Sequence, residues 1–450
     1  MGNFSPDILI TWLLTSLQSL PDERKGDNTR YEVVDAGLGA FSLFFTQCPS
    51  FLEFQRQMEN ATGKSNANSL FAMRAIPKDQ QIRRLLDTAD PQILFPVFNR
   101  CLRMLTKTGE ITRFQTDLGY LLIFDGTQSV SSAKIHCSSC LIKKDAQGTR
   151  HYYHSLLTPI LAKPEGTHVL PLIPEYISNT DGTSKQDCEN KAAKRSLERN
   201  GGELLFLLKK ITVLGDDLYC HQPLIEKLKG SGFHYILICK PDSHAFLYDW
   251  LSGIPEGKQA FEINAVTSRV YTGGHHETIT YRYINTVPLR DGKDAVFVNW
   301  CEMRIVNEKT QKTVYLNSFV TDHQISDENV SLICTTGRTR WKIENENNNT
   351  LKTKGYHFEH NYGHGEKYLV NFLNTLMLLA FLFHTLLDLF YAPFIFLRGK
   401  FTRQAFFHAI RALTQLFYCS SWEHLFAAMR YGLEKGLPLP PYPYAPLPSG

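Results

Sequence analysis

The pattern of apolar and polar residues changes at a few positions along this chain, and these changes divide it into predicted segments. Up to about residue 115 the pattern is helical. Ser5 and Pro6 are typical of a helix start, and apolar residues recur at helical spacing through residues 76–109. Residues 1–115 are therefore predicted to form a helical N-terminal region.

Residues 116–250 consist of short apolar runs between polar turns, with helical stretches among the later runs. Three predicted strands come first, in "GYLLIFDGTQSV", "HYYHSLLTPIL" and "THVLPLIPEYI". A helix, a strand, a helix and a strand follow, in "CENKAAKRSLERNGGELLFLLKK", "ITVLGDDLY", "QPLIEKLKGSG" and "HYILICKPD". This order predicts an α/β unit, a mixed sheet flanked by helices, in a chain that is α+β overall.

The pattern changes again in the second half of the chain. Residues 251–333 alternate between apolar and polar positions, in "ITYRYINTV", "DAVFVNWCEMRIV" and "KTVYLNSFVTD", and are predicted to be an all-β insertion. Residues 334–430 return to helical spacing. Residues 431–450 contain six prolines and are predicted to be an extended tail.

The most apolar stretch, residues 368–397, is either a buried helix or a membrane span. Asn371, Asn374, His384, Asp388 and Pro393 interrupt it. Its longest uninterrupted part covers residues 376–383, whereas about 18 apolar residues are needed to cross a bilayer. A buried core helix is therefore predicted, and a protein anchored to a membrane through this stretch is the alternative.

Composition describes a folded protein but does not identify its partner. The chain is 43% hydrophobic and 20% charged, which excludes an intrinsically disordered chain. Its net charge of +4 is compatible with a polyanionic partner without requiring one. The ten cysteines are scattered, as expected for reduced thiols in the cytoplasm rather than for a disulfide framework.

Two acids follow predicted strands. Asp125 ends the run "LLIFD" and Asp216 ends "ITVLGD". Side chains at the ends of neighbouring strands converge, and carboxylates held close together repel one another unless a cation neutralises them. Mg²⁺ prefers such hard oxygen ligands, and a pair of ions can assist phosphoryl transfer. The two acids therefore predict a metal-dependent phosphodiester enzyme, although Asp125 could simply begin a turn with Gly126.

Such a site needs a third acid, and the segment after the predicted insertion offers four: Glu344, Glu346, Glu359 and Glu366. In "RWKIE", Arg340 and Glu344 are four residues apart, so on a helix they share a face.

The series "FDGT", "GDDLY", a β-rich insertion and "RWKIE" resembles the DDE transposases of bacterial insertion sequences. The resemblance covers roughly residues 100 to 390 and implies an RNase H-like core. In that family the third acid lies in a signature of Tyr, two residues, Arg, three residues, Glu, six residues, Lys. Arg340 and Glu344 fit it. The chain departs at two positions, with Gly337 in place of the Tyr, and Leu351 in place of the Lys followed by Lys352.

The resemblance implies that Asp125, Asp216 and Glu344 are the catalytic residues and the ligands of two Mg²⁺ ions, for which Mn²⁺ could substitute. Asp217 is the second choice for the middle acid. The implied reactions are metal-dependent cleavage at transposon ends and transfer of the 3′-hydroxyl ends into target DNA.

The same resemblance assigns roles to the rest of the chain and to its partners. Residues 1–115 would recognise the terminal inverted repeats, residues 116–250 would begin the catalytic core, and residues 334–430 would close it. The partners implied are transposon-end DNA, target DNA and a second copy of the chain in a homodimer. The expected location is the cytoplasm of a bacterium, at the nucleoid, with no membrane attachment.

Several basic residues are candidates for DNA contacts. Arg340 and Lys352 lie in the third-acid segment. Lys191, Arg195 and Arg199 form a stripe on one predicted helix. Such a stripe either neutralises phosphates or is simply a solvated face.

Two groups of residues have partial metal-ligand spacing. "IHCSSC", with His136, Cys137 and Cys140, could be half of a zinc site, but no second pair follows at the usual spacing. Cys188, Cys220 and His221 could complete it in space, and ordinary thiols are the alternative. His357, His360 and His364 are spaced as on one helix face, although the glycines around them favour a loop.

The alternative function is a DNA-binding protein derived from a transposase that has lost its activity. The departures at Gly337 and Leu351 favour that alternative, and the presence of Asp125, Asp216 and Glu344 opposes it.

Overall fold

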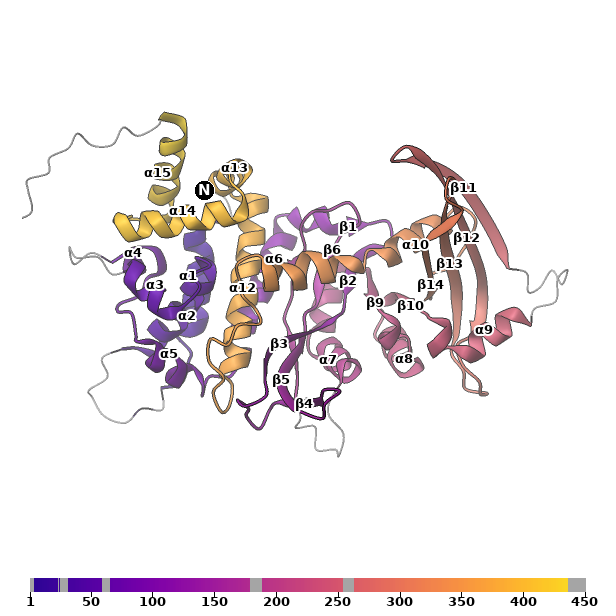
Figure 1. Cartoon of the computed structure of the whole chain (residues 1–450), viewed down its shortest axis with the longest axis horizontal. Coiled ribbons are helices and arrows are strands. Elements are labelled where there is room, and N and C mark those ends of the chain that lie inside the picture. The colour runs from indigo at the N-terminus through magenta and orange to yellow at the C-terminus, as the bar shows by residue number, and fades with distance from the viewer. Residues whose placement is uncertain are drawn as a thin grey trace, which may run out of the picture. The chain divides into compact units, whose positions relative to one another are not determined.

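The computed structural model describes residues 4–22, 24, 31–58, 65–178, 188–253 and 263–435 (Figure 1). The chain forms two compact units. One comprises Met1–Leu85 and Phe383–Gly450, and the other comprises Leu86–Leu382. The division into two units does not test the boundaries of the five predicted segments, which stay predictions.

The first unit is helical in its described residues. Its N-terminal helices are α1 (Pro6–Leu17), α2 (Val33–Phe45), α3 (Phe51–Met58), α4 (Asn66–Phe71) and most of α5 (Asp79–Leu86). Its C-terminal helices are α13 (Ala392–Lys400), α14 (Arg403–Leu416) and α15 (Trp422–Lys435). The Ser5 side chain caps α1, as predicted from the sequence. Of the predicted tail, residues 431–435 belong to α15 and residues 436–450 lie outside the described residues.

Both ends of the chain contribute to the core of this first unit. Trp422 is completely buried, its ring lies 5.2 Å from that of Phe45, and its indole N–H donates to the carbonyl of Leu70 at 2.8 Å. His384 lies beside Phe45, and its ring Nε2–H donates to the Phe45 backbone oxygen at 3.0 Å. Burial of these aromatic side chains stabilises the packing of the C-terminal helices on the N-terminal ones.

The second unit is built on a large mixed sheet. Its central strands are β2 (Gly119–Ile123), β6 (Ile160–Ala162), β7 (Leu170–Pro171), β9 (Ile211–Gly215) and β10 (His234–Ile238), with the short β1 (Gln115–Thr116) pairing with β2. They lie in the order β7-β6-β2-β9-β10. The β7–β6 and β6–β2 pairs are antiparallel, whereas the β2–β9 and β9–β10 pairs are parallel.

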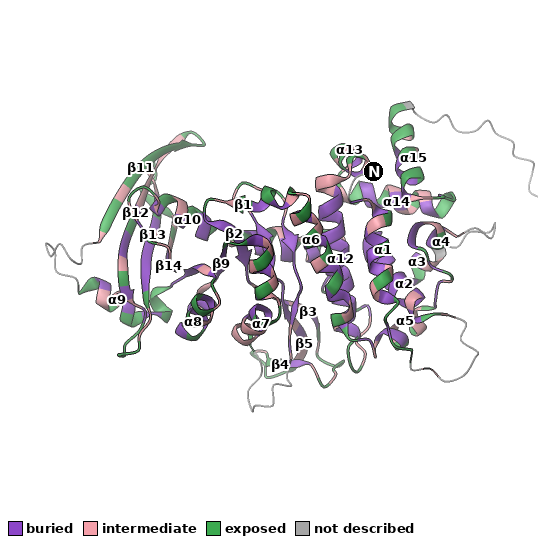
Figure 2. Ribbon diagram, turned by 180° about the vertical axis from the view of Figure 1, so that it is seen from behind, coloured by how far each residue is buried: buried purple, intermediate pink, exposed green. Residues whose placement is uncertain are grey.

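Helices complete this core. Helix α7 (Glu189–Leu208) precedes β9 and α8 (Gln222–Gly230) connects β9 to β10, while α6 (Phe95–Lys107) precedes the first strand. Three antiparallel strands followed by two parallel, helix-connected strands confirm the predicted mixed sheet flanked by helices in an α+β chain. The buried colour of β2 and β9 in Figure 2 marks the centre of the sheet, where every residue of both strands is buried.

Two of the predicted strands are divided in the structure. The stretch "GYLLIFDGTQSV" forms β2 and then β3 (Gly126–Ser132), and "HYYHSLLTPIL" forms β5 (Arg150–Leu157) and then β6. Strands β3 and β5 belong to a smaller sheet, in which β5 lies between β3 and β4 (Leu141–Lys144) and also pairs with β8 (Glu175–Ile177), whereas β2 and β6 pair in the large sheet. The chain therefore passes from one sheet to the other at Asp125, a change of partner that hydrophobicity alone does not reveal.

The β insertion extends the large sheet. Its strands are β11 (Asn264–Thr272), β12 (His275–Pro288), β13 (Phe297–Asn307) and β14 (Lys312–Thr321), and α9 (Ala245–Ser252) precedes them. Strand β14 pairs antiparallel with β10, so β11–β14 continue the sheet outward from its parallel edge (Figure 1).

The segment with the candidate third acid consists of short helices. After α10 (Val330–Arg338) come a π-helix (Ile343–Asn348), α11 (Asn349–Thr353) and the long α12 (Leu369–Phe390). Helix α12 is the one described helix long and apolar enough to cross a membrane, but 94% of its most apolar window is buried inside the structure. This burial is consistent with the core helix of a soluble protein (Figure 2).

Both departures from the transposase signature are tightly packed positions. A Cβ on Gly337 would lie 2.7 Å from the ring of Phe319 and 2.9 Å from a methyl group of Ile236, so α10 touches the sheet where a larger side chain has no room. Leu351 has an exposed fraction of 0%. In this fold the two positions therefore belong to the core, and a Tyr or Lys would not fit there.

Gly337→Ala is accordingly expected to lower the free energy of unfolding by about 1–3 kcal/mol, because overpacking displaces the helix or the ring. Chemical denaturation measures the change. Gly230→Ala is the matched control, since a Cβ there meets nothing within 4 Å, and we expect it to be neutral or slightly stabilising. Equal stability of the Gly337 variant and the wild type would contradict this close approach.

Candidate active site

Asp125 lies where the chain leaves the large sheet. The preceding residues Ile123 and Phe124 are buried, and the Asp125 backbone oxygen accepts a hydrogen bond from the amide of Thr158 at 3.1 Å. Its carboxylate oxygen Oδ2 accepts from the side-chain amide of Asn348 at 2.9 Å. The carboxylate is therefore held at the end of a central strand by the segment that carries the candidate third acid.

Asp216 occupies the equivalent position on the neighbouring strand. In the parallel β2–β9 pair Ile123 lies opposite Leu214, so Asp125 and Asp216 each follow two residues beyond that pair. The Asp216 side chain caps the short 3₁₀ helix Asp217–Tyr219 by accepting from the amide of Leu218 at 2.9 Å. Parallel strands bring their carboxyl ends to one edge of a sheet, as the strand-end pattern predicts.

Asp217, the second choice for the middle acid, has a different environment. Its carboxylate accepts from the amide of Lys240 at 2.7 Å and from the hydroxyl of Ser243, and it lies 3.5 Å from Nε2 of His244. These contacts join the ends of β9 and β10. The geometry therefore favours Asp216 over Asp217 as the acid that faces Asp125.

Glu344 lies in the π-helix after α10. Its carboxylate forms an ion pair with Arg340 at 2.6 Å, the contact expected from their spacing, and its side chain is 51% exposed. The fallback acid Glu359 is instead paired with Lys352 at 2.8 Å and is 59% exposed. Among these acids Glu344 is the one with an electrostatic interaction with Asp125.

The electrostatics of Asp125 reveal a concentration of negative charge. Burial raises its pKa to about 7, with further repulsion from Glu189, Glu344 and Asp216, against an opposing effect of Arg340. An ordinary carboxyl group has a pKa near 4, so this shift leaves the Asp125 carboxyl group partly protonated at neutral pH. Perturbation of this kind in a buried acid is typical of functional sites.

Glu189 was not anticipated from the sequence. It lies in the first turn of α7 and its Oε2 accepts from the amide of Gly126 at 3.2 Å and from the hydroxyl of Tyr219 at 3.0 Å. Burial, followed by repulsion from Asp216, raises its pKa, and the hydrogen bond from Tyr219 opposes the shift. A Cβ at Gly126 would overlap the Glu189 carboxyl group, which explains the need for glycine there.

Asn347 and Asn348 fix the third-acid helix to the sheet. Besides donating to Asp125, Asn348 accepts from the side-chain amide of Asn347 at 2.9 Å and from the hydroxyl of Thr158 at 3.1 Å. Asn347 also donates to Thr158 at 3.2 Å. This buried network connects the helix that carries Glu344 to the end of the Asp125 strand.

The carboxylates surround one region without closing into a compact metal site. The ligand oxygens of Asp125, Asp216 and Glu344 do not all lie within 4.8 Å of one another. Carboxylate oxygens are nevertheless the type of donor that Mg²⁺ prefers, and the pKa of Asp125, raised mainly by burial, is raised further by repulsion from the neighbouring acids. A divalent cation would remove that repulsion.

Both arginines in the predicted basic stripe have intramolecular partners. Arg195 and Arg199 both bind the carboxylate of Glu175, at 2.9 and 2.7 Å, and Glu175 is 6% exposed. Lys191 is half-buried on the same helix. The guanidinium groups therefore neutralise a buried acid, and DNA contacts by this stripe, like those of Arg340 and Lys352, stay predictions.

Neither a known protein-family model nor a curated protein matches this chain.

Proposed function

We propose that this protein is a DNA transposase that cleaves transposon ends and transfers their 3′-hydroxyl groups into target DNA, with Asp125, Asp216 and Glu344 as ligands of two Mg²⁺ ions. The observation that carries the proposal is the buried Asp125, with its pKa raised to about 7, among Glu189, Glu344 and Asp216 at the edge of an RNase H-like sheet. A charge cluster of this kind has no stabilising role of its own, because like charges oppose folding.

In this proposal each residue has a defined part. When bound, the metal ions would activate the attacking oxygen and stabilise the leaving oxygen of the phosphodiester. Asp125 and Asp216 hold fixed positions at neighbouring strand ends. Asn348 orients the Asp125 carboxylate, and Arg340 holds Glu344 through Oε1. The exposed side of Glu344 is where DNA would approach.

The partners follow from the same proposal. The helical N-terminal region would bind the terminal inverted repeats, and a homodimer would hold two DNA ends together. Lys352 would contact phosphates after releasing Glu359, and Arg340 would contact them while its ion pair with Glu344 is kept. The proposed location is the bacterial cytoplasm, at the nucleoid.

The test uses the purified full chain and a supercoiled plasmid that carries the DNA segments flanking its coding region. With Mg²⁺ or Mn²⁺ we expect cleavage at the outer ends of those segments and joining of the free 3′-hydroxyl ends to a second plasmid. EDTA should abolish both. Sequencing of the products maps the cleaved and joined positions.

The second candidate is an inactive DNA-binding protein, favoured by the open arrangement of the three carboxylates. Binding of the flanking DNA without cleavage under any metal condition would establish that alternative and overturn the enzyme. Absence of both binding and cleavage would contradict the two candidates together.

A further inference from the structure

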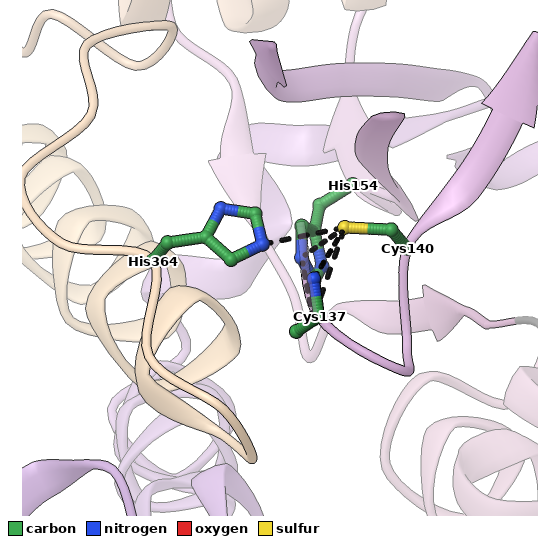
Figure 3. Close-up of side chains that lie close together, drawn as sticks. All are labelled: Cys137, Cys140, His154 and His364. Carbon is green, nitrogen blue, oxygen red and sulfur yellow. Dashed lines mark hydrogen bonds between the residues drawn. The ribbon is translucent and has the colours of Figure 1, made fainter. Parts of the chain in front are cut away.

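Four side chains from three separate parts of the second unit meet at one point away from the carboxylates (Figure 3). Cys137 and Cys140 lie in the turn between β3 and β4, His154 lies on β5, and His364 lies in the segment between α11 and α12. Their ligand atoms all lie within 4.8 Å of one another. Only the Cys137–Cys140 pair has a recognisable spacing in the sequence.

The distances among these atoms match those between the ligands of a tetrahedral zinc ion. The two sulfur atoms are 3.8 Å apart, Nε2 of His154 is 3.5 Å from each sulfur, and Nε2 of His364 is 3.3 Å from the sulfur of Cys140. Zn–S bonds of ~2.3 Å and Zn–N bonds of ~2.0 Å at tetrahedral angles require about 3.8 Å between sulfurs and about 3.5 Å between sulfur and nitrogen.

Local structure orients the ligands toward this point. The amide of Cys140 donates to the backbone oxygen of Cys137 at 3.3 Å, closing a turn that directs both thiols to the same side. Cys140 and His154 are buried, and Cys137 and His364 are partly buried. Both cysteines are free of disulfides, and the sulfurs are too far apart for an S–S bond.

Cysteine binds zinc as the thiolate, so binding of the ion would release the thiol protons of Cys137 and Cys140.

We propose that Cys137, Cys140, His154 and His364 bind one structural Zn²⁺ ion. Four protein ligands complete a tetrahedral shell and leave no position for a substrate, which is the property of structural rather than catalytic zinc sites. The ion would join the small sheet, which begins directly after Asp125, to the segment that follows the Glu344 and Asn348 helix. It would thus hold together the segment that follows Asp125 and the segment that follows Glu344.

Two other groups of possible ligands lie in the described residues. Cys220, Cys239 and His244 are buried and supply three ligands. His234, Asp322 and His323 form the second group, in which His234 is already hydrogen-bonded to Asp322 at 2.9 Å. Neither group contains four mutually close ligand atoms, so the Cys137 site is the one with a complete shell.

His136, His357 and His360 do not belong to the site. The His136 ring lies 4.4 Å from that of Tyr152, and His360 lies against Tyr362. Residues 354–368 are not helical, as the glycines around the histidines predict, so the three histidines share no helix face and His364 alone reaches the cysteines.

The test measures metal content of the full chain expressed with zinc and purified without chelators. We expect about one Zn²⁺ per chain in the wild type and less than about 0.2 in Cys137→Ser and His364→Ala, because loss of one of four ligands weakens a structural site strongly. Cys239→Ser, from the rival group, is the matched control and should keep the ion. Removal of zinc should lower Tm by about 5–10 °C.

Co²⁺ substitution of the wild type should give the visible bands of a tetrahedral ion together with sulfur-to-cobalt charge transfer. If the variants do not fold, X-ray absorption of the wild-type zinc protein identifies the ligands of the ion. The proposal requires two sulfurs and two imidazoles. Absence of zinc from the wild type, loss of zinc in Cys239→Ser alone, or a shell with a single imidazole would each overturn the proposal. These readouts do not depend on DNA cleavage, so they are independent of the proposed function.

Discussion

Asp125→Asn, Asp216→Asn and Glu344→Gln are each expected to reduce Mg²⁺-dependent cleavage and strand transfer by roughly 10³-fold or more, the scale seen when one member of a cooperating catalytic set is removed. Each substitution keeps the shape of the side chain and removes a charged oxygen ligand, which Mg²⁺ prefers. Binding of end DNA should not be weakened, because the acids repel phosphates rather than attract them. Product formation on labelled DNA and fluorescence anisotropy measure the two properties separately.

Asp242→Asn is the matched control for these substitutions. Asp242 is exposed in the loop after β10 and lies in no contact with the cluster described above. Its variant should cleave at the wild-type rate. Cleavage retained by Glu344→Gln but lost in Glu359→Gln would move the third acid to Glu359, and full activity of Asp125→Asn would contradict the proposed mechanism altogether.

Asp217→Asn separates the two candidates for the middle acid. Because Asp217 accepts from the amide of Lys240 and the hydroxyl of Ser243, its loss should lower stability more than activity. Asp216 caps only a short 3₁₀ helix, so its substitution should affect activity with little change in stability. The reverse result would assign the middle position to Asp217.

Local sequence patterns predict the strand-end acids and the fold class. Parallel strands with acids at their carboxyl ends place Asp125 and Asp216 at one edge, whatever surrounds them. The spacing of Arg340 and Glu344 likewise predicts their ion pair, since four residues make about one helical turn. The order of strands and helices predicts the mixed sheet.

Such patterns do not predict contacts between residues that are far apart in the sequence. Glu189 lies in the first turn of α7, where an acid is ordinary, and it reaches Gly126 only because α7 lies against the end of β2. Asn348 reaches Asp125 across 223 residues. An asparagine run after Glu344 is visible in the sequence, but nothing local shows that its amides point into the core.

The same limit applies to charge and metal ligands. A basic stripe on a helix has the same spacing whether or not a buried acid lies beside it, so the spacing does not predict the ion pairs of Arg195 and Arg199 with Glu175. His154 and His364 are isolated histidines in the sequence. They meet the Cys137–Cys140 turn only after β5 and the segment before α12 have folded beside it.

Glu189→Gln is expected to shift the pH dependence of the protein, because Glu189 is the acid that raises the pKa of Asp125 most after burial itself. In the wild type without metal, the folded state holds a proton on Asp125 up to about pH 7, whereas the unfolded chain loses it near pH 4. The folded state therefore binds more protons in this window, and the free energy of unfolding falls as pH rises through it.

Removing the Glu189 charge lowers the pKa of Asp125, so the fall in the free energy of unfolding should end at a lower pH, and the variant should be more stable than the wild type near pH 7.5 without metal. Thermal unfolding from pH 4 to 8 measures this. Cleavage, which requires ionised Asp125, should begin at lower pH in the variant, and a higher Mg²⁺ concentration should be needed if Glu189 also attracts the ions. Glu198→Gln, exposed on the same helix beside Lys227, is the control and should leave both profiles in place. A Glu189 variant with the wild-type profile would show that its charge does not act on Asp125.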